Sequence, residues 1–351
     1  MSAHRSSIVA TLFLALFILF AAIAQTAVAG GRALGGEEGV DLIVVEFNCE
    51  NLFDCRHDSL KDDVAFLPDG ENIWTHARYW KKINNIARVI LACGEQADGT
   101  CAIPDIVALC EVENDSVMRD LTRRSLLRNA AYEYVMTDSP DLRGIDVALL
   151  YSPMTFRVVD SHPIRVTPLK DMRPTRDILY VKGRTASRDT LHLFVVHAPS
   201  RSGGEMETRS HRRLVADAVA QRIDSLHAID REAKIMVMGD FNDYDGARSL
   251  RLVANHGMRD VSKNAKGSHG AKGTYKYRGE WGSLDHIFLS DNLVDAVVDC
   301  RIADPEFVLE KDNDYGGVKP GRNMLGTMWR NGYSDHLPLV LRLRMTVNGV
   351  P

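Results

Sequence analysis

The eight residues Ile235-Met236-Val237-Met238-Gly239-Asp240-Phe241-Asn242 contain the pattern that decides the fold. Four apolar residues suit a short buried strand, and polar groups follow them at once. Gly239 allows another group to approach the backbone closely. Asp240 can position or deprotonate a water molecule, and Asn242 can hold a phosphate oxygen. Because the two side chains are spaced to share one face, the segment predicts a strand that delivers a reactive pair.

Similar apolar runs recur along the chain, each short enough for a strand. Two longer stretches, Tyr79–Ala92 and Glu207–Ile229, carry apolar residues at helical spacing instead. Strand-like runs separated by amphipathic stretches predict sheets covered by helices. The spacing alone leaves open whether the strands are parallel. The other predicted strands are Leu42–Phe47, Ile106–Leu109, Val147–Tyr151, Leu191–Val196, Leu284–Leu289 and Leu337–Leu343.

Two of these runs end in groups that suit phosphate or metal chemistry. Asn48 follows the first run and offers an amide to a phosphate oxygen or a metal-bound water. Glu111 ends the second run, and a hard cation such as Mg²⁺ takes one or two carboxylates. Glu113 would share the face of Glu111 if the strand continued, so it is a competing ligand. Alone, an Asn in this place is usually a turn residue.

Two histidines stand at the ends of other apolar runs. His197 can donate a proton to a phosphoryl oxygen or to a leaving group. His336 follows Asp335, and Asp285 can hold one of its ring nitrogens while Asp335 turns toward a metal. Each residue alone has an ordinary structural explanation. Their common place at strand ends makes coincidence a poor account of the set.

The chain resembles the endonuclease/exonuclease/phosphatase superfamily in an ordered set of motifs between about Leu42 and Leu343. The resemblance implies an α/β (α+β) fold, a four-layer sandwich with two central mixed β-sheets packed face to face and flanked by helices. It also implies a metal-dependent phosphoric ester hydrolase that uses Mg²⁺ or Mn²⁺. The motifs are FNxxNLF from Phe47 to Phe53 (with Cys49 and Glu50 at the variable positions), the strand-end Glu111, Gly239-Asp240-Phe241-Asn242, Asp285 and Ser334-Asp335-His336.

The resemblance further implies a role for each motif. It makes Glu111 the metal ligand, with Asn48 and Asp335 in or near the metal shell. It leaves open whether Asp240 or His336 is the general base, because the family accommodates both. The catalytic residues that it implies are His336, Asp285, Asp240, Asn242 and His197.

The sequence indicates the type of reaction more clearly than it indicates the substrate. The His-Ala-Pro-Ser sequence that begins at His197 resembles the corresponding sequence in the deoxyribonuclease branch of this superfamily. Hydrolysis of DNA or RNA is therefore the leading hypothesis. Arg143, Arg176 and Arg278 are the predicted contacts to substrate phosphate. The formal net charge is -4, which argues against a non-specific nucleic-acid-binding module. The alternative, a phosphodiesterase or phosphatase acting on a lipid or small-molecule phosphate ester, would share every catalytic residue.

The N-terminus has the layout of a secretory signal peptide. Arg5 precedes an apolar run over Ile8–Ala24, and small residues follow at Ala27–Ala29. We therefore expect a signal peptide over residues 1–29, a flexible lead-in over 30–40 and a single domain over 41–351. The mature protein would be a periplasmic or extracellular monomer without a membrane span, and an uncleaved membrane anchor is the alternative. A disulfide between Cys93 and Cys101 would staple the loop between them.

Overall fold

Two six-stranded sheets form the centre of the computed structural model, which describes residues 39–95, 99–170 and 172–347. Both sheets are mixed, because β1–β2 and β7–β8 pair in parallel and the remaining neighbours are antiparallel. The first sheet consists, in order, of β13 (Val297–Ile302), β18 (Leu339–Thr346), β1 (Gly39–Leu52), β2 (Ile106–Val112), β4 (Asp146–Tyr151) and β3 (Glu133–Met136). The second consists of β5 (Phe156–Ile164), β6 (Ile178–Thr185), β7 (Thr190–His197), β8 (Lys234–Asp240), β12 (Asp285–Ser290) and β9 (Met258–Asp260).

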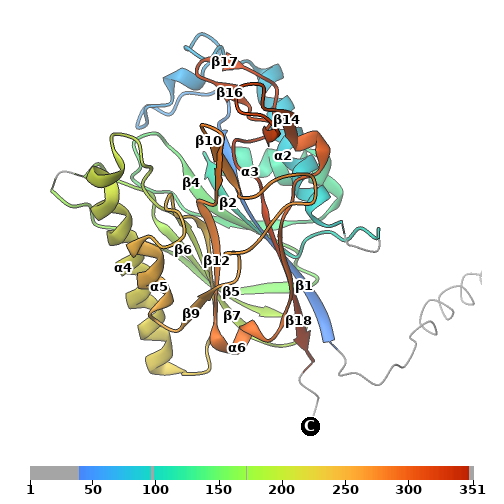
Figure 1. The fold of residues 1–351 in the computed structure, drawn as a ribbon, viewed down its shortest axis with the longest axis vertical. Helices are drawn as coiled ribbons and strands as arrows, with labels where there is room; N and C mark the ends of the chain where they lie inside the picture. The colour runs from blue at the N-terminus through green and yellow to red at the C-terminus, as the bar shows by residue number, and fades with distance from the viewer. Residues whose placement is uncertain (1–38, 96–98, 171, 348–351) are drawn as a thin grey trace, which may run out of the picture. The chain divides into compact units, whose positions relative to one another are not determined.

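The two sheets face each other, and helices cover their outer faces (Figure 1). Val107 and Val195 belong to one buried cluster to which both sheets contribute. Helices α2 (His76–Cys93) and α3 (Asp115–Arg123) pack on the first sheet. Helices α4 (Glu205–Ile229) and α5 (Arg248–Ala254) pack along the second (Figure 1). The predicted four-layer sandwich is therefore confirmed.

Helix α2 forms where the sequence has both a start signal and an apolar stripe. Thr75 caps α2, since its hydroxyl accepts a hydrogen bond from the backbone N–H of Arg78. Ile83, Ile86 and Ile90 follow at intervals of three and four residues and are buried against the first sheet. Central strands such as β2 are buried on both faces, which explains why they read as apolar runs rather than as alternating patterns.

Several strand ends near one another adopt an unusual backbone conformation. β1 and β2 each carry a register shift toward their carboxyl ends. Glu50, Asn51 and Glu111 have φ angles of 52°, 57° and 61° there, and Asn242, just after β8, has 51°. L residues with side chains rarely adopt this left-handed region. Such bulges re-aim side chains, and these ones turn polar residues toward a common point.

All the predicted strands and both predicted helices are confirmed, with small differences at their ends. The elements that were not predicted include helices α3 and α5, strands β3, β5, β6, β9 and β13, the hairpin β10–β11 (Tyr275–Tyr277 with Glu280–Gly282) and a pair of small hairpins near the C-terminus. β5 was missed because most of its side chains are exposed, which leaves no apolar run. The hairpins are β14–β15 (Leu309–Lys311 with Val318–Pro320) and β16–β17 (Met324–Leu325 with Met328–Trp329).

Two expectations need correction. Gly39 and Val40 were assigned to a flexible lead-in, but they belong to β1 and pair with Thr346 and Met345 of β18. The predicted signal peptide and residues 30–38 lie outside the described residues. The six cysteines are all described and are all free thiols, so the expected disulfide between Cys93 and Cys101 is absent. No described helix is long and apolar enough to cross a membrane.

Candidate active site

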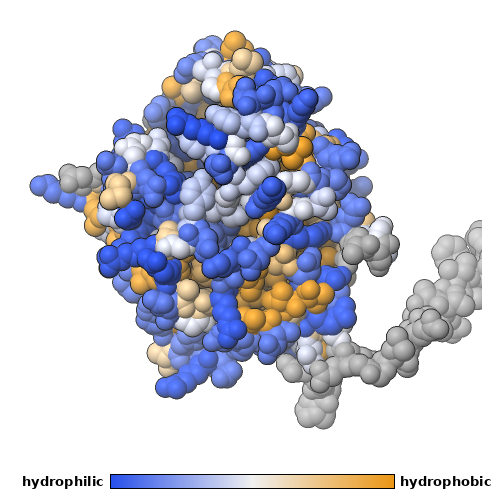
Figure 2. Space-filling model, in the orientation of Figure 1, coloured by the Kyte–Doolittle hydropathy of each residue, from blue (hydrophilic) through white to orange (hydrophobic). Residues whose placement is uncertain are grey.

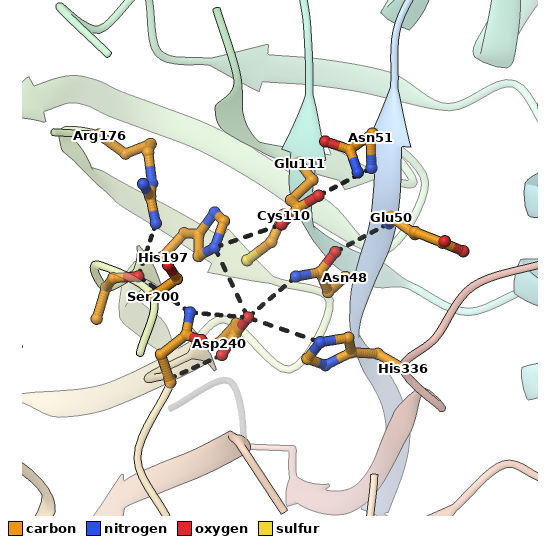
Figure 3. A network of polar contacts seen from close by, with 12 residues as sticks. Asn48, Glu50, Asn51, Cys110, Glu111, Arg176, His197, Ser200, Asp240 and His336 are labelled. Carbon is orange, nitrogen blue, oxygen red and sulfur yellow. Dashed lines mark hydrogen bonds and ion pairs between the residues drawn. The ribbon is translucent and has the colours of Figure 1, made fainter. Parts of the chain in front are cut away.

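The predicted site residues meet where four central strands end (Figure 3). Asn48 lies near the end of β1 and Glu111 near the end of β2, while His197 ends β7 and Asp240 ends β8. Parallel pairing within each sheet brings these ends to the same level. The two sheets are joined across the interior, because Asn48 Nδ2 donates a hydrogen bond of 3.0 Å to Asp240 Oδ2.

Asp240 is the centre of this network. Its Oδ1 accepts the backbone N–H of Asn242 at 2.8 Å, and its Oδ2 accepts the side-chain amides of Asn48 and Asn242. Burial and the nearby Asp285 carboxylate raise the pKa of Asp240 to about 7, although His336 and these hydrogen bonds act against the rise. A carboxyl with a pKa near neutrality is suited to take and release a proton.

His336 and Asp285 form a buried imidazole–carboxylate pair. His336 Nδ1 lies 2.8 Å from Asp285 Oδ2, and the other ring nitrogen, Nε2, lies 3.9 Å from Asp240 Oδ2. Thr274 also donates its hydroxyl to Asp285 Oδ2. Burial disfavours the charged imidazole, but the two carboxylates outweigh it and hold the pKa of His336 well above its usual value. His336 is therefore an imidazolium at neutral pH.

His197 stands on the other side of Asp240 in the opposite protonation state (Figure 3). Its Nε2 lies 3.6 Å from Asp240 Oδ2 and 3.8 Å from Glu111 Oε1. Burial, followed by the charges of Arg176 and Arg143, holds the pKa of His197 well below its usual value. The ring is thus neutral, and its Nδ1 is buried without a hydrogen-bond partner.

The structure separates the two acids that the sequence left as competitors. Glu111 lies beside His197, and its Oε2 accepts the backbone N–H of Asn51 at 2.9 Å. Glu113 instead accepts the backbone N–H of Asp54 at 2.6 Å. The left-handed turn at Glu111 breaks the strand alternation that would have placed both acids on one face. Of these two acids, Glu111 is therefore the one that belongs to the site.

Asp335 lies at the edge of the site in an acidic group. Arg322 Nη2 donates to Asp335 Oδ2 at 2.8 Å, and Arg322 Nε lies 3.6 Å from Glu50 Oε1. Glu50 is buried, and burial and the Asp335 carboxylate raise its pKa to about 7. Added positive charge at this place would relieve the repulsion between these acids.

A model of the endonuclease/exonuclease/phosphatase family matches residues 43–345. The chain belongs to the endonuclease/exonuclease/phosphatase family. It is accordingly a metal-dependent phosphoester hydrolase. A search of curated protein sequences gave no match.

Solved structures of this family share the fold at low sequence identity. A Bacteroides thetaiotaomicron endonuclease/exonuclease/phosphatase family protein gives a TM-score of 0.57 at 15% identity, covering 88% of this chain and 99% of its own. The mannosyl-6-phosphatase of the same organism gives 0.57 at 16%, covering 86% and 98%. The catalytic domain of human Nocturnin gives 0.52 at 18%, covering 87% and 96%. At these identities the likeness shows the fold alone.

The oxygen-rich donor set fits the divalent metal of this family. Carboxylates and an amide oxygen are the ligands that hard cations such as Mg²⁺ take. Asp240, Asp285 and His336 have ligand atoms within 4.8 Å of one another. However, the imidazolium of His336 and the hydroxyl of Thr274 already bind Asp285. Glu111 lies beside this group and adds a further carboxylate, while Glu50 and Asp335 are paired with Arg322.

The three predicted arginines differ in their freedom to bind a substrate. Arg143 is about half exposed, and its Nη2 lies 3.8 Å from Glu111 Oε2. Arg176 is buried, where it binds Asp141 at 3.3 Å and the carbonyl of Ala198 at 2.6 Å. Arg278 lies apart from the other two, beside Tyr277. Only Arg176 is thus committed to holding the protein together.

Lys82 is a residue of the site that the sequence analysis missed. It is fully buried in α2 and donates to the backbone carbonyl of Tyr333, just before the motif that carries Asp335. Burial lowers the pKa of Lys82, while the nearby carboxylate of Glu50 acts in the opposite direction. The helical period places Lys82 on the apolar stripe of α2, so that pattern contained the signal. Nothing comparable in the sequence indicated Arg322.

Proposed function

We propose that the protein is an exported Mg²⁺-dependent nuclease that hydrolyses phosphodiester bonds in DNA or RNA. The observation that carries this proposal is the pair of imidazoles on either side of Asp240, at 3.6 Å for His197 and 3.9 Å for His336. Cleavage of a diester develops charge on the phosphoryl oxygens and on the leaving alcohol. The charged imidazole of His336 can stabilise the phosphoryl oxygens, and the neutral imidazole of His197 can stabilise the leaving alcohol. The two rings lie on either side of Asp240, the proposed base.

The protonation state of each residue determines its proposed role in the reaction. The His336 imidazolium, oriented by Asp285, binds a non-bridging phosphate oxygen. Asp240 accepts the proton of the attacking water, which the amide of Asn242 helps to position. The neutral His197 ring donates an N–H hydrogen bond to the leaving oxygen. Glu111, with Asp335 and Asn48 nearby, would hold the metal, which would supply Lewis-acid stabilisation of the phosphoryl oxygens.

Arg143 completes this arrangement on the side of Glu111. Its guanidinium is about half exposed and is held by the side chain of Asn51. Guanidinium groups bind phosphate oxygens in bidentate fashion. We therefore assign Arg143, rather than the buried Arg176, to the direct phosphate contact.

The test measures hydrolysis with Mg²⁺ and with EDTA on plasmid DNA, RNA, sphingomyelin and an inositol phosphate. Glu111→Ala, Asp240→Asn and His336→Ala should each lower turnover by orders of magnitude with the fold intact. His256→Ala is the matched control, because this histidine also pairs with an aspartate, at 2.7 Å, but lies outside the site. Near-native turnover in two of the three site variants would contradict the assignment.

The same panel separates the proposal from its alternative. A phosphodiesterase or phosphatase on a lipid or small phosphate ester would use the same residues. Cleavage of only those esters would keep the mechanism and overturn the nuclease proposal.

Export rests on residues 1–29 alone, whose charged start, apolar run and small residues are typical of a signal peptide. N-terminal sequencing of the protein recovered outside the cytoplasm should give a start near Gly30. A start at Met1 would contradict cleavage.

A further inference from the structure

A small cavity adjoins the catalytic centre on the side of Asp335. Its volume is about 240 Å³, and Asp335 lines it. Tyr275, another lining residue, forms a β-bridge with His336, and the two rings lie 5.1 Å apart between their centroids. One wall is the hairpin β10–β11 (Tyr275–Tyr277 with Glu280–Gly282), and the other comes from the segment with the hairpins β14–β15 and β16–β17 (Figure 1). A group bound here would lie next to His336, the residue assigned above to a phosphate oxygen.

The cavity gathers the exposed aromatic side chains of the protein. Tyr277 is 54% exposed and Tyr315 is 61% exposed, and among the residues that the structure describes no other aromatic side chain is as open. Both line this cavity. The tip of the hairpin lies against Tyr315, because a Cβ at Gly279 would come within 2.8 Å of that side chain. Exposed aromatic faces beside a phosphate-binding site are suited to stack a base.

Arg278 supplies the one uncommitted cation of this cavity. Its guanidinium lies over the Tyr277 ring, 5.2 Å from the centroid, and no described carboxylate pairs with it. The other cations of the lining are paired: Lys276 with Asp312, Lys319 and Arg330 with Glu310, and Arg322 with Asp335. Figure 2 shows mostly hydrophilic side chains over this part of the molecule.

The backbone holds Arg278 in place at a conformational cost. Arg278 has a φ of 48° and Gly279 a φ of 87°, so both central residues of the two-residue hairpin turn are left-handed. Such turns favour asparagine, aspartate or glycine at the first of these positions. A strained residue that the surroundings over-determine points to a function of its side chain.

We propose that this cavity is a subsite for one unpaired nucleoside of the substrate, next to the scissile phosphate. This inference rests on the proposed nuclease function. The base stacks on Tyr277 and Tyr315, and Arg278 binds the phosphate that follows. The cavity is smaller than the roughly 300–1,000 Å³ of sites for drug-sized ligands, so it takes a single unit. A volume of about 240 Å³ does not hold a base pair, so the proposed substrate is single-stranded.

The test compares three substrates of the same length: single-stranded oligothymidylate, the same strand as a duplex, and an all-abasic strand that keeps the phosphates. Tyr277→Ala and Tyr315→Ala should each lower kcat/KM on oligothymidylate by roughly 10- to 100-fold. They should leave kcat/KM on the abasic strand unchanged. The unaltered protein should cleave the single strand at least about 10-fold faster than the duplex, since unpairing costs a few kcal/mol.

The arginine is tested separately through the salt dependence of cleavage. Arg278→Gly preserves the left-handed turn, and it should reduce the slope of log kcat/KM against log salt by about 0.7 on the single strand. Arg157→Ala is the matched control, because Arg157 is an exposed arginine without a described ion pair on β5, and it should leave the slope unchanged. Thermal unfolding of each variant confirms that the fold is intact.

Failure of this inference can be told from failure of the proposed function. If the unaltered protein cleaves oligothymidylate but the tyrosine variants lose nothing, or lose equally on the abasic strand, the subsite is overturned and the nuclease function stands. Equal cleavage of duplex and single strand overturns the subsite as well. If the unaltered protein cleaves none of the three substrates in Mg²⁺, and single-stranded RNA of the same length no better, the nuclease function fails and the subsite fails with it.

Discussion

The Asp285→Asn variant tests the protonation states on which the mechanism depends. Asp285 is fully buried, and its Oδ2 lies 2.8 Å from His336 Nδ1. An opposite charge this close shifts a pKa by roughly 1–3 units, which corresponds to about 1.4–4 kcal/mol. The asparagine keeps the shape of the side chain but loses this charge, so the pKa of His336 should fall by that amount. Because the active form carries a charged His336, activity is present below this pKa and is lost as the pH rises through it.

The same substitution acts on Asp240. The Asp285 carboxylate helps to raise the pKa of Asp240 to about 7. Activity requires ionised Asp240, so it appears as the pH rises through that value. Asp285→Asn lowers this pKa too. Both limbs of the pH profile of kcat/KM should therefore move to lower pH, the alkaline limb by roughly 1–3 units.

The assay measures kcat/KM on a phosphodiester across the pH range at saturating Mg²⁺. Asp260→Asn is the matched control, because Asp260 holds the buried His286 at 2.9 Å in the same type of pair outside the mechanism. It should lower stability without moving either limb. An alkaline limb that stays in place in Asp285→Asn would refute a charged His336 in the reaction.

Three further predictions concern the metal, the leaving group and the stability of the fold. EDTA should abolish hydrolysis, and Glu111→Gln should raise the Mg²⁺ concentration for half-maximal activity at least roughly 10-fold; an unchanged Mg²⁺ requirement would exclude Glu111 as a ligand. His197→Ala should lower kcat on DNA by roughly 10²–10³-fold but much less on a nitrophenyl diester, whose leaving oxygen carries less charge and needs less help from a hydrogen bond. Equal losses on both substrates would argue against a hydrogen bond from His197 to the leaving oxygen. Arg212→Ala should lower the free energy of unfolding by about 3–5 kcal/mol, because Arg212 is buried with its Nε 2.7 Å from Asp243. Denaturant unfolding measures this change, and a loss below about 1 kcal/mol would show that the pair contributes little.

Much of the site could be predicted because the apolar runs in the sequence coincide with the strands whose pairing brings the site residues together. The apolar runs before Asn48, Glu111, His197 and Asp240 are buried on both faces, so their strands are visible in the sequence. A strand that ends in a polar residue must bring that residue to the edge of the core. Parallel pairing then makes the edges coincide.

The remainder depends on contacts between distant segments, which leave no local pattern. Arg322 binds Asp335 from a segment of short strands without an apolar period, and that segment also closes the cavity beside Tyr277. The choice between Glu111 and Glu113 depended on a single backbone turn. A strand pattern read from sequence assumes regular alternation, and alternation fails at a bulge.

The left-handed residues at the strand ends have a consequence for how this enzyme would respond to selection. Glu50, Asn51, Glu111 and Asn242 each hold a backbone conformation that costs about 1–3 kcal/mol. Glycine adopts the same conformation freely, so replacing any of them with glycine relaxes the backbone while removing a polar group from the active site. The same glycine would remove hydrogen bonds, such as those that Glu50 accepts from the backbone N–H groups of Asn323 and Met324. A laboratory population selected only for heat resistance would therefore retain a glycine only where the relaxed backbone outweighs this loss, and there it would lose turnover. Thermostabilised descendants of this protein should be sought under a simultaneous requirement for hydrolysis.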